Sequence, residues 1–160
     1  MLLYASMRPR SQLRGHAAVA VAFPPDAWTQ GIEFQERGKR YEEKIYEGIT
    51  YVLVRCRQYS NGVQRVINMF EFAFWLPKIC NRYQKPDAIV STSMTPLACA
   101  QGVRMARKYG CGNIAQISDL WPETLIAYGI AGKYNIAVLF LRKVEKWIYK
   151  NAERIIFTME

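Results

Sequence analysis

The sequence predicts an α/β fold with a mainly parallel sheet and helices on both faces, and three observations support this prediction. Short apolar runs lack an alternation of apolar and polar residues, which is typical of parallel strands covered on both faces. Amphipathic helical patterns lie between these runs. From Asp87 onward the predicted order is strand, helix, strand, loop, helix, strand, and such an alternation favours right-handed crossovers between parallel strands.

The predicted strands are short apolar or β-branched segments with polar or proline-containing ends. Pro24 and Pro25 end the first of them, because proline cannot donate a hydrogen bond to a neighbouring strand. The segment 26–48 is charged and rich in tyrosine, and we expect it to be an excursion between the first two strands. The predicted strands are 17–23, 50–55, 87–91 and 154–158, with 113–117 as a weaker fifth.

Helical patterns lie between the predicted strands. Thr95 is a favourable N-cap with Pro96 at the first helical position, and Gly110 stops this helix after Tyr109. Asn135 caps a second helix, on which Arg142, Lys146 and Lys150 form a polar stripe. The predicted helices are 96–109, 135–150 and 66–75, the last ended by Pro77 with a weaker continuation to Tyr83. The predicted apolar face of the helix 135–150 consists of Ile136, Phe140, Val144, Trp147 and Ile148.

Length, composition and charge restrict the class of protein. A chain of 160 residues has the size of one domain, and 51% apolar residues exclude whole-chain disorder. No segment has the length and apolar character of a membrane span, and the N-terminus lacks the pattern of a signal peptide. We therefore expect the protein in the cytoplasm. The net charge of +9 allows a nucleic acid or an anionic membrane as a partner.

Cysteine and histidine usage excludes several kinds of site. The four cysteines include no C-x-x-C pair, and His16 is the only histidine, so zinc-ligand spacing is absent. We expect the cysteines to be buried or incidental thiols in a reducing compartment. Any catalysis should therefore depend on carboxylates, backbone amides or the bound substrate.

The segment after the strand 87–91 is a candidate binding site. In open α/β sheets, ligands bind beyond the carboxyl ends of the strands. There the hydroxyls of Thr92, Ser93 and Thr95 precede the N-terminus of a helix, whose unpaired N–H groups favour a phosphate or a sugar oxygen. The alternative is that Thr95 only caps the helix.

The segment after the strand 113–117 is a second candidate site. Asp119 follows this strand, where a carboxylate can accept a proton from a sugar hydroxyl, and the ring of Trp121 can stack on a sugar. Ser118 and Glu123 flank these two residues. The alternative is a structural turn in which Asp119 caps a short helix and Trp121 fills the core.

The string Ser118-Asp-Leu-Trp-Pro-Glu-Thr124 is the most specific motif of the sequence. It resembles Arg-Asp-Leu-Trp-Pro-Glu-Ser, which is typical of the family-4 glycosyltransferases, and the sequence is most similar to a bacterial branch related to surface-polysaccharide fucosamine transferases. Weaker likenesses occur in the family's order: Arg14-Gly-His16, Phe23-Pro24, Tyr46-Glu-Gly-Ile49, Lys85-Pro-Asp-Ala-Ile-Val90, Ala127-Tyr-Gly129 and the helix from Val144 to Ala152 with the strand that follows it. Ser118 replaces the usual arginine, so an anion contact at that position is not expected.

The resemblance implies a GT-B architecture, in which two Rossmann-like domains enclose the active site. Residues 1–160 are similar to a single, incomplete N-terminal, acceptor-side domain, so we expect the C-terminal donor-binding domain to be absent. The family's opening strand and glycine-rich loop also have no counterpart. We therefore expect residues 1–14 to be the end of the first helix, and the loss of the opening strand to expose neighbouring strand edges.

The resemblance further implies transfer of a sugar from a nucleotide-sugar donor to a lipid-linked or surface-polysaccharide acceptor, without metal. Asp119 would be the catalytic residue at the acceptor site. The substrate-binding residues would be Ser118, Trp121, Glu123, Thr92, Ser93 and Thr95. We expect the isolated chain to be inactive, because most nucleotide-sugar contacts in this family come from the missing domain.

A non-catalytic basic module that binds an anionic membrane surface or nucleic acid is the alternative function. The aromatic-rich segment 66–83, with Arg65, Lys78, Arg82 and Lys85 nearby, suits a membrane interface, although packing against the sheet is the simpler alternative. The basic residues lie on several separate elements and no nucleic-acid-binding motif is present, so nucleic acid is not an expected partner. We therefore expect a cytoplasmic protein that can associate peripherally with the inner face of the plasma membrane.

Overall fold

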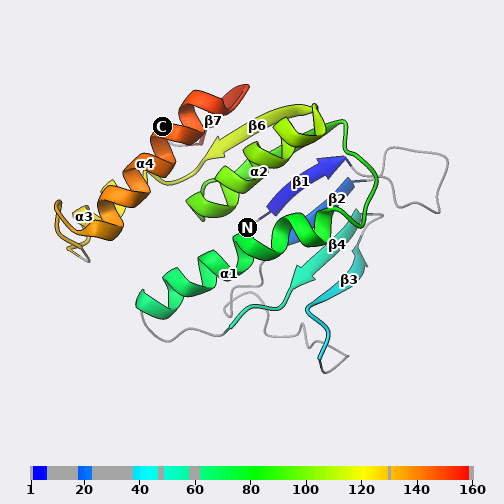
Figure 1. The fold of residues 1–160 in the computed structure, drawn as a ribbon, viewed down its shortest axis with the longest axis horizontal. Coiled ribbons are helices and arrows are strands. Elements are labelled where there is room, and N and C mark those ends of the chain that lie inside the picture. The colour runs from blue at the N-terminus through cyan, green and yellow to red at the C-terminus, as the bar shows by residue number, and fades with distance from the viewer. Residues whose placement is uncertain are drawn as a thin grey trace.

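The structure, a computed structural model, describes residues 2–6, 18–22, 38–46, 49–57, 62–129 and 131–158. These residues form one seven-stranded sheet with helices packed against it (Figure 1). The strands are β1 (Leu2–Ser6), β2 (Ala18–Ala22), β3 (Tyr41–Tyr46), β4 (Ile49–Val54), β5 (Ala88–Thr92), β6 (Gly112–Ile117) and β7 (Arg154–Phe157). The helices are α1 (Gly62–Cys80), α2 (Pro96–Tyr109), α3 (Glu123–Ala127) and α4 (Ile136–Asn151).

The strand order confirms the predicted Rossmann-like α/β fold. The order is β3-β4-β2-β1-β5-β6-β7, in which β2 and β4 are parallel to each other, as are β5, β6 and β7. Because β1 is antiparallel to both β2 and β5, these five strands all point in one direction. Without β3, the sheet has the strand order 3-2-1-4-5-6 of doubly wound nucleotide-binding folds.

The strand β1 corrects the expectation for residues 2–6, which form a strand and not the end of a helix, whereas residues 7–14 lie outside the described residues. Leu2–Ser6 is the central strand of the sheet, so the sheet has no gap where the opening strand was expected to be missing. Leu3 pairs with Val21 on one side and with Ser91 on the other, and this pairing covers the edges of β2 and β5. Figure 1 shows β1 pointing opposite to β4 and β6, so its first residues lie at their carboxyl ends.

The strand β3 was not predicted either, because its segment was taken as an excursion. Tyr41–Tyr46 pairs antiparallel with β4 at the outer edge of the sheet, from Tyr41 opposite Val54 to Tyr46 opposite Ile49. This strand includes Glu42, Glu43 and Lys44, and charged side chains of this kind are common on edge strands, where they oppose pairing with another chain. The predicted strands are confirmed as β2, β4, β5, β6 and β7, with small shifts at their ends.

The helix α2 has the predicted bounds and α4 extends one residue beyond them. The side chain of Asn135 accepts a hydrogen bond from the N–H of Ala137 at 2.9 Å, which confirms the predicted cap of α4. Thr95 stands at the N-cap position of α2, but its side chain makes no capping hydrogen bond. Gly110, with φ of 59°, ends α2 in the left-handed conformation that glycine adopts at low cost.

The helix α1 continues through Pro77 to Cys80, so the expected stop at this proline is wrong. Proline costs a helix one hydrogen-bond donor and adds a steric clash. On the same turns, however, Phe72, Leu76 and Ile79 are buried in the core, and this burial favours continuation of the helix.

The predicted apolar face of α4 is covered only toward the C-terminal end of the helix. Ile148 is buried and Val144 and Trp147 pack against buried residues of α2 and β6, whereas Ile136 and Phe140 are 85% and 42% exposed. Val138 and Leu141, which were not part of the predicted face, are also buried. The composition of an amphipathic helix indicates that one face is apolar, but the neighbouring helices decide which residues are covered. Here α4 packs against α2, with which it makes most of its helix contacts among the described residues.

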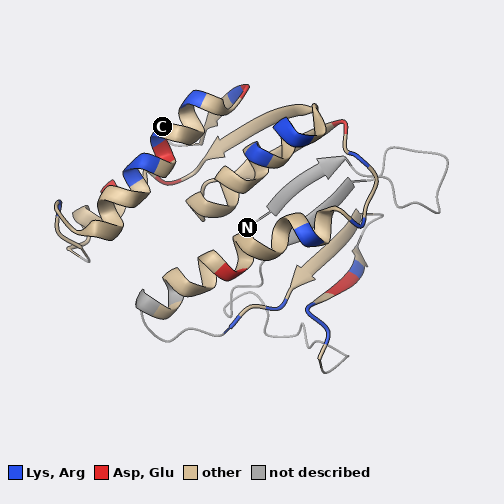
Figure 2. Cartoon of the chain, viewed as in Figure 1, with Lys and Arg blue, Asp and Glu red and all other residues tan. Residues whose placement is uncertain are grey.

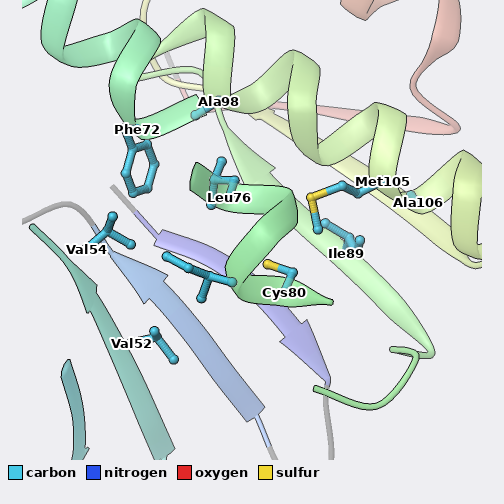
Figure 3. Close-up of a cluster of buried hydrophobic side chains, with 10 residues drawn as sticks. Val52, Val54, Phe72, Leu76, Cys80, Ile89, Ala98, Met105 and Ala106 are labelled. Carbon is cyan, nitrogen blue, oxygen red and sulfur yellow. The ribbon is translucent and has the colours of Figure 1, made fainter. Parts of the chain in front are cut away.

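The core lies between the sheet and one layer made of α1, α2 and α4. Figure 3 shows residues of α1 and α2 above Val52 and Val54 of β4 and Ile89 of β5. A second cluster joins Cys99 and Val103 of α2, Ala115 of β6 and Ile148 of α4. Ile89 of β5 pairs with Asn113 of β6, and both residues are buried. The alternating buried positions of the two strands therefore lie on the same face of the sheet. The described helices therefore cover one face, and the connections before and after β2 lie outside the described residues.

None of the helices in the described part of the chain is long and apolar enough to cross a membrane.

Candidate functional site

The carboxyl ends of β5 and β6 bring four of the predicted site residues together. These strands are adjacent and parallel, so the segments that follow them meet at one edge of the sheet. The hydroxyls of Thr92 and Ser118 lie 3.1 Å apart. The hydroxyl of Ser93 accepts a hydrogen bond from the N–H of Ser118 at 3.0 Å and donates one to the carbonyl of Asp119 at 3.4 Å.

The hydroxyls after β5 are buried and engaged with the protein itself. Ser91, Thr92 and Ser93 are at most 7% exposed, and Ser91 contacts the sulfur of Cys99 at 3.6 Å. Buried hydroxyls of this kind are normally hydrogen-bonded, because an unsatisfied one costs free energy. In this arrangement they hold the two loops together, and the predicted substrate contacts of Thr92 and Ser93 remain a prediction.

Asp119 is half-buried in the loop that follows β6. Among the described residues, no donor is hydrogen-bonded to this carboxylate. It does not cap the short helix α3 either, because the N-cap position belongs to Pro122. A carboxylate placed in this way can accept a hydrogen bond or a proton from a hydroxyl.

Trp121 lies in the core instead of on the surface. It is 7% exposed and packs in a cluster with Met69 of α1 and Leu141 of α4. The peptide bond between Trp121 and Pro122 is cis. The burial of its ring favours the packing alternative, and the predicted substrate contact of Trp121 remains a prediction.

Glu123 is engaged in an ion pair that was not predicted. Its carboxylate accepts hydrogen bonds from Nε and Nη2 of Arg142, at 3.0 and 2.8 Å. Arg142 belongs to the predicted polar stripe of α4, but sequence alone gave no reason to pair it with a residue 19 positions earlier. The pair links the loop after β6 to α4, with both hydrogen bonds at Oε1 of Glu123, and the predicted substrate contact of Glu123 remains a prediction.

Thr95 lies where α2 begins, on the same side of the sheet. Its carbonyl accepts hydrogen bonds from the N–H groups of Ala98 and Cys99, at 3.0 and 3.1 Å. The helix α2 therefore begins near the Ser93–Ser118 contact. A helix end and a carboxylate at the carboxyl edge of parallel strands suit a polar ligand with hydroxyl groups.

The cysteines are not arranged for nucleophilic chemistry. Burial raises the pKa of Cys56 and of Cys80 to about 12, and that of Cys99 to about 11. Burial also raises the pKa of the less covered Cys111. At neutral pH these thiols are protonated and weakly nucleophilic. Within the described ranges, no three histidine, cysteine or carboxylate side chains are grouped as metal ligands.

Two cavities in the described part of the chain are not lined by any of the predicted site residues. One of about 760 Å³ lies between β3 and α1. The other, of about 440 Å³, is a groove between α1, α2 and α4, and we call it the helical groove. Figure 2 shows basic residues distributed over α1, α2 and α4.

Comparison with known proteins gives one relative. The chain is similar to a probable glycosyltransferase, WbjE, of Pseudomonas aeruginosa, with 25% identity over 100 residues. The similar region is 62% of this chain and 24% of that protein, so the chain matches about a quarter of the relative's length. No family model and no solved structure matches the chain. The similarity supports a distant relationship to glycosyltransferases.

Proposed function

We propose that this chain is the acceptor-side part of a glycosyltransferase that moves a sugar from a nucleotide-sugar to a lipid-linked or polysaccharide acceptor. The observation that carries this proposal is the distant similarity to a probable glycosyltransferase. The Rossmann-like sheet and the polar residues at its carboxyl edge are consistent with it. The string Ser118-Asp-Leu-Trp-Pro-Glu-Thr124, which carries the resemblance to family 4, forms part of that edge.

In this proposal Asp119 acts on the acceptor. Its carboxylate accepts a hydrogen bond from the reacting hydroxyl, orients it and takes up its proton as the new glycosidic bond forms. We expect no metal or other cofactor, as the resemblance to family 4 implies. The bond between the sugar and the phosphate oxygen of the donor breaks as the glycosidic bond forms, and the nucleotide leaves with the electron pair of the broken bond. Trp121 and the Glu123–Arg142 pair hold the loop that carries Asp119.

Residues 1–160 form one incomplete domain in this proposal, and a second domain supplies the donor-binding contacts. The chain by itself is then expected to transfer no sugar. The test uses the longest open reading frame that contains residues 1–160, expressed and purified beside the chain itself. Transfer of radiolabelled sugar to extracted lipid and polysaccharide acceptors is measured with a panel of nucleotide-sugars.

The variant Asp119→Asn should reduce kcat by about 10²–10⁴-fold, the range for loss of one acid–base group. The matched control is Asp87→Asn, the same substitution on an exposed residue just before β5, at the opposite edge of the sheet. Near-normal turnover of Asp119→Asn would remove Asp119 from the reaction. Absence of transfer with every donor would contradict the proposed function, and transfer by residues 1–160 alone would contradict the need for a second domain.

The helical groove favours a membrane surface as a further partner. Phe70 and Phe74 of α1 are 49% and 60% exposed, and Phe70 stacks on Phe140 of α4 with ring centroids 6.0 Å apart. Arg104 and Lys143 lie among the lining residues, and no acidic residue does. An apolar surface with a basic border suits the anionic headgroups of the inner leaflet, where a cytoplasmic enzyme would meet a lipid-linked acceptor.

Sedimentation with vesicles tests this partner. The chain should sediment with vesicles containing anionic phospholipid and much less with neutral ones, and Phe74→Glu should reduce the bound fraction. Ile45→Glu is the matched control, because Ile45 is 73% exposed on the edge strand β3. Equal binding by both variants would exclude the helical groove as the membrane contact.

A further inference from the structure

The cavity between β3 and α1 is lined by basic side chains that rest on aromatic rings. Its volume of about 760 Å³ is in the range of small-molecule sites. The guanidinium of Arg40 lies 5.2 Å from the ring centre of Trp75, and the ammonium of Lys78 lies 4.6 Å from the same ring. Arg82 lies 5.2 Å from the ring of Tyr41 and donates a hydrogen bond to its hydroxyl at 2.8 Å.

Two of these cations have no acidic partner among the described residues. Arg40 pairs with Glu71 at 3.2 Å, whereas neither Lys78 nor Arg82 forms an ion pair with a described carboxylate. The aromatic contacts restrict the freedom of these long side chains before a ligand arrives. Less conformational entropy is then lost on binding, which favours recognition of an anion.

The cavity also contains the carboxylate of Glu43, which accepts a hydrogen bond from the hydroxyl of Tyr83. Glu42 lies 3.9 Å from the ammonium of Lys44, and this pair belongs to the opposite face of β3, because successive side chains of a strand alternate between its two faces. A ligand with charge on every unit, such as a polyphosphate or nucleic acid, would be repelled by Glu43. A ligand with few negative charges and many hydroxyls could pair with Lys78 and Arg82 while one of its hydroxyls donates to this carboxylate.

We propose that this cavity binds an anionic saccharide, a sugar chain that carries carboxylate or phosphate groups. The site is separate from the carboxyl edge that holds Asp119. The edge strand β3 and the strand β6 are five positions apart in the sheet, which is about 24 Å at the usual strand spacing. The proposal does not depend on sugar transfer, because binding by residues 1–160 is measured directly.

Isothermal titration with purified residues 1–160 tests the proposal. The probes are an oligogalacturonate for the carboxylate arm, a phosphorylated oligosaccharide for the phosphate arm, a neutral malto-oligosaccharide and inorganic phosphate. At least one anionic saccharide should bind, more tightly than both the neutral sugar and inorganic phosphate, and added salt should weaken it. The anionic probe that binds more tightly shows whether the cavity recognises a carboxylate or a phosphate group on the saccharide.

The variants Lys78→Gln and Arg82→Gln should each weaken binding by about tenfold or more, as expected for loss of a charge-assisted hydrogen bond. Lys146→Gln removes the same charge from the exposed surface of α4 and should leave the affinity unchanged. Thermal unfolding of each variant checks the fold, and Lys78→Gln decides the question if Arg82→Gln is unstable. Binding of neither anionic saccharide, equal binding of inorganic phosphate, or equal weakening by Lys146→Gln would overturn the proposal.

Discussion

The hydroxyl of Ser93 accepts a hydrogen bond from the backbone N–H of Ser118 at 3.0 Å, and this contact joins the segments that follow two neighbouring parallel strands. The two residues are 25 positions apart in the sequence. Their contact fixes the start of the loop that carries Asp119. The position of the proposed catalytic carboxylate therefore depends on one buried hydroxyl on the neighbouring strand end.

Loss of this hydroxyl should destabilise the protein. In Ser93→Ala the N–H of Ser118 loses its acceptor in a largely buried place, and the expected cost is about 1–3 kcal/mol in the free energy of unfolding. Met94→Ala, at the exposed neighbouring position, should change it by less than about 0.5 kcal/mol. Urea unfolding measures both variants, and equal effects would show that the Ser93 contact contributes nothing specific.

A proline in β1 should be far more harmful than a small polar residue at the same place. Ala5 is paired with Val19 on one side and Ile89 on the other, so Ala5→Pro removes an N–H from the centre of the sheet. The unsatisfied partner alone is expected to cost about 1–3 kcal/mol. Ala5→Ser keeps the N–H, so it should lower the midpoint of thermal unfolding by much less than Ala5→Pro. Similar stability of the two variants would contradict the central position of β1.

Two phenylalanines of α1 should differ in their contribution to stability. Phe72 is 1% exposed in the core, and Phe72→Ala should lower the free energy of unfolding by about 3–5 kcal/mol. Phe74 is 60% exposed at the helical groove, so Phe74→Ala should have a much smaller effect. Chemical denaturation compares them, and a reversed order would mean that α1 is rotated relative to the sheet.

The buried thiols should react slowly in the folded protein. Burial raises the pKa of Cys80 to about 12 and that of Cys99 to about 11, so little thiolate is present at a pH below the ordinary thiol value of 9.0. A disulfide reagent under these conditions should modify Cys111, which is partly exposed, before Cys80 or Cys99. All four cysteines should react after unfolding. Rapid modification of Cys80 in the native state, located by peptide mapping, would contradict its burial.

Glu145 should make stability depend on pH. Burial raises the pKa of its carboxyl above 4.5, although the hydrogen bond from Tyr149 opposes this effect. A raised folded-state pKa gives stability that is present below pH 4.5 and lost as pH rises through the raised value. Glu145→Gln keeps an acceptor for the hydroxyl of Tyr149 and cannot ionise, so its stability relative to wild type should improve from acidic to neutral pH. Urea unfolding at several pH values measures the difference in free energy of unfolding between Glu145→Gln and wild type, with the exposed Asp87→Asn as control. A difference that does not change with pH would contradict the raised pKa of Glu145.

Local sequence patterns were sufficient for much of the fold. Apolar runs predicted β2, β4, β5, β6 and β7, because short β-branched and apolar segments favour strands whatever they pack against. Capping residues such as Asn135 and Gly110 located helix ends, because these signals act within one turn. The same order of elements placed Thr92, Ser93, Ser118 and Asp119 at one edge of the sheet, where the structure also has them.

The tertiary structure alone decided the remaining features, since they depend on residues distant in sequence. Leu2–Ser6 is a central strand only because β2 and β5 provide partners on both sides, and β3 is a strand because it pairs with β4. Trp121 lies in the core because Met69 and Leu141 converge on it, and Glu123 is paired because α4 brings Arg142 to it. A local sequence pattern indicates which secondary structure a residue favours. Packing between segments distant in sequence determines which other residues it contacts.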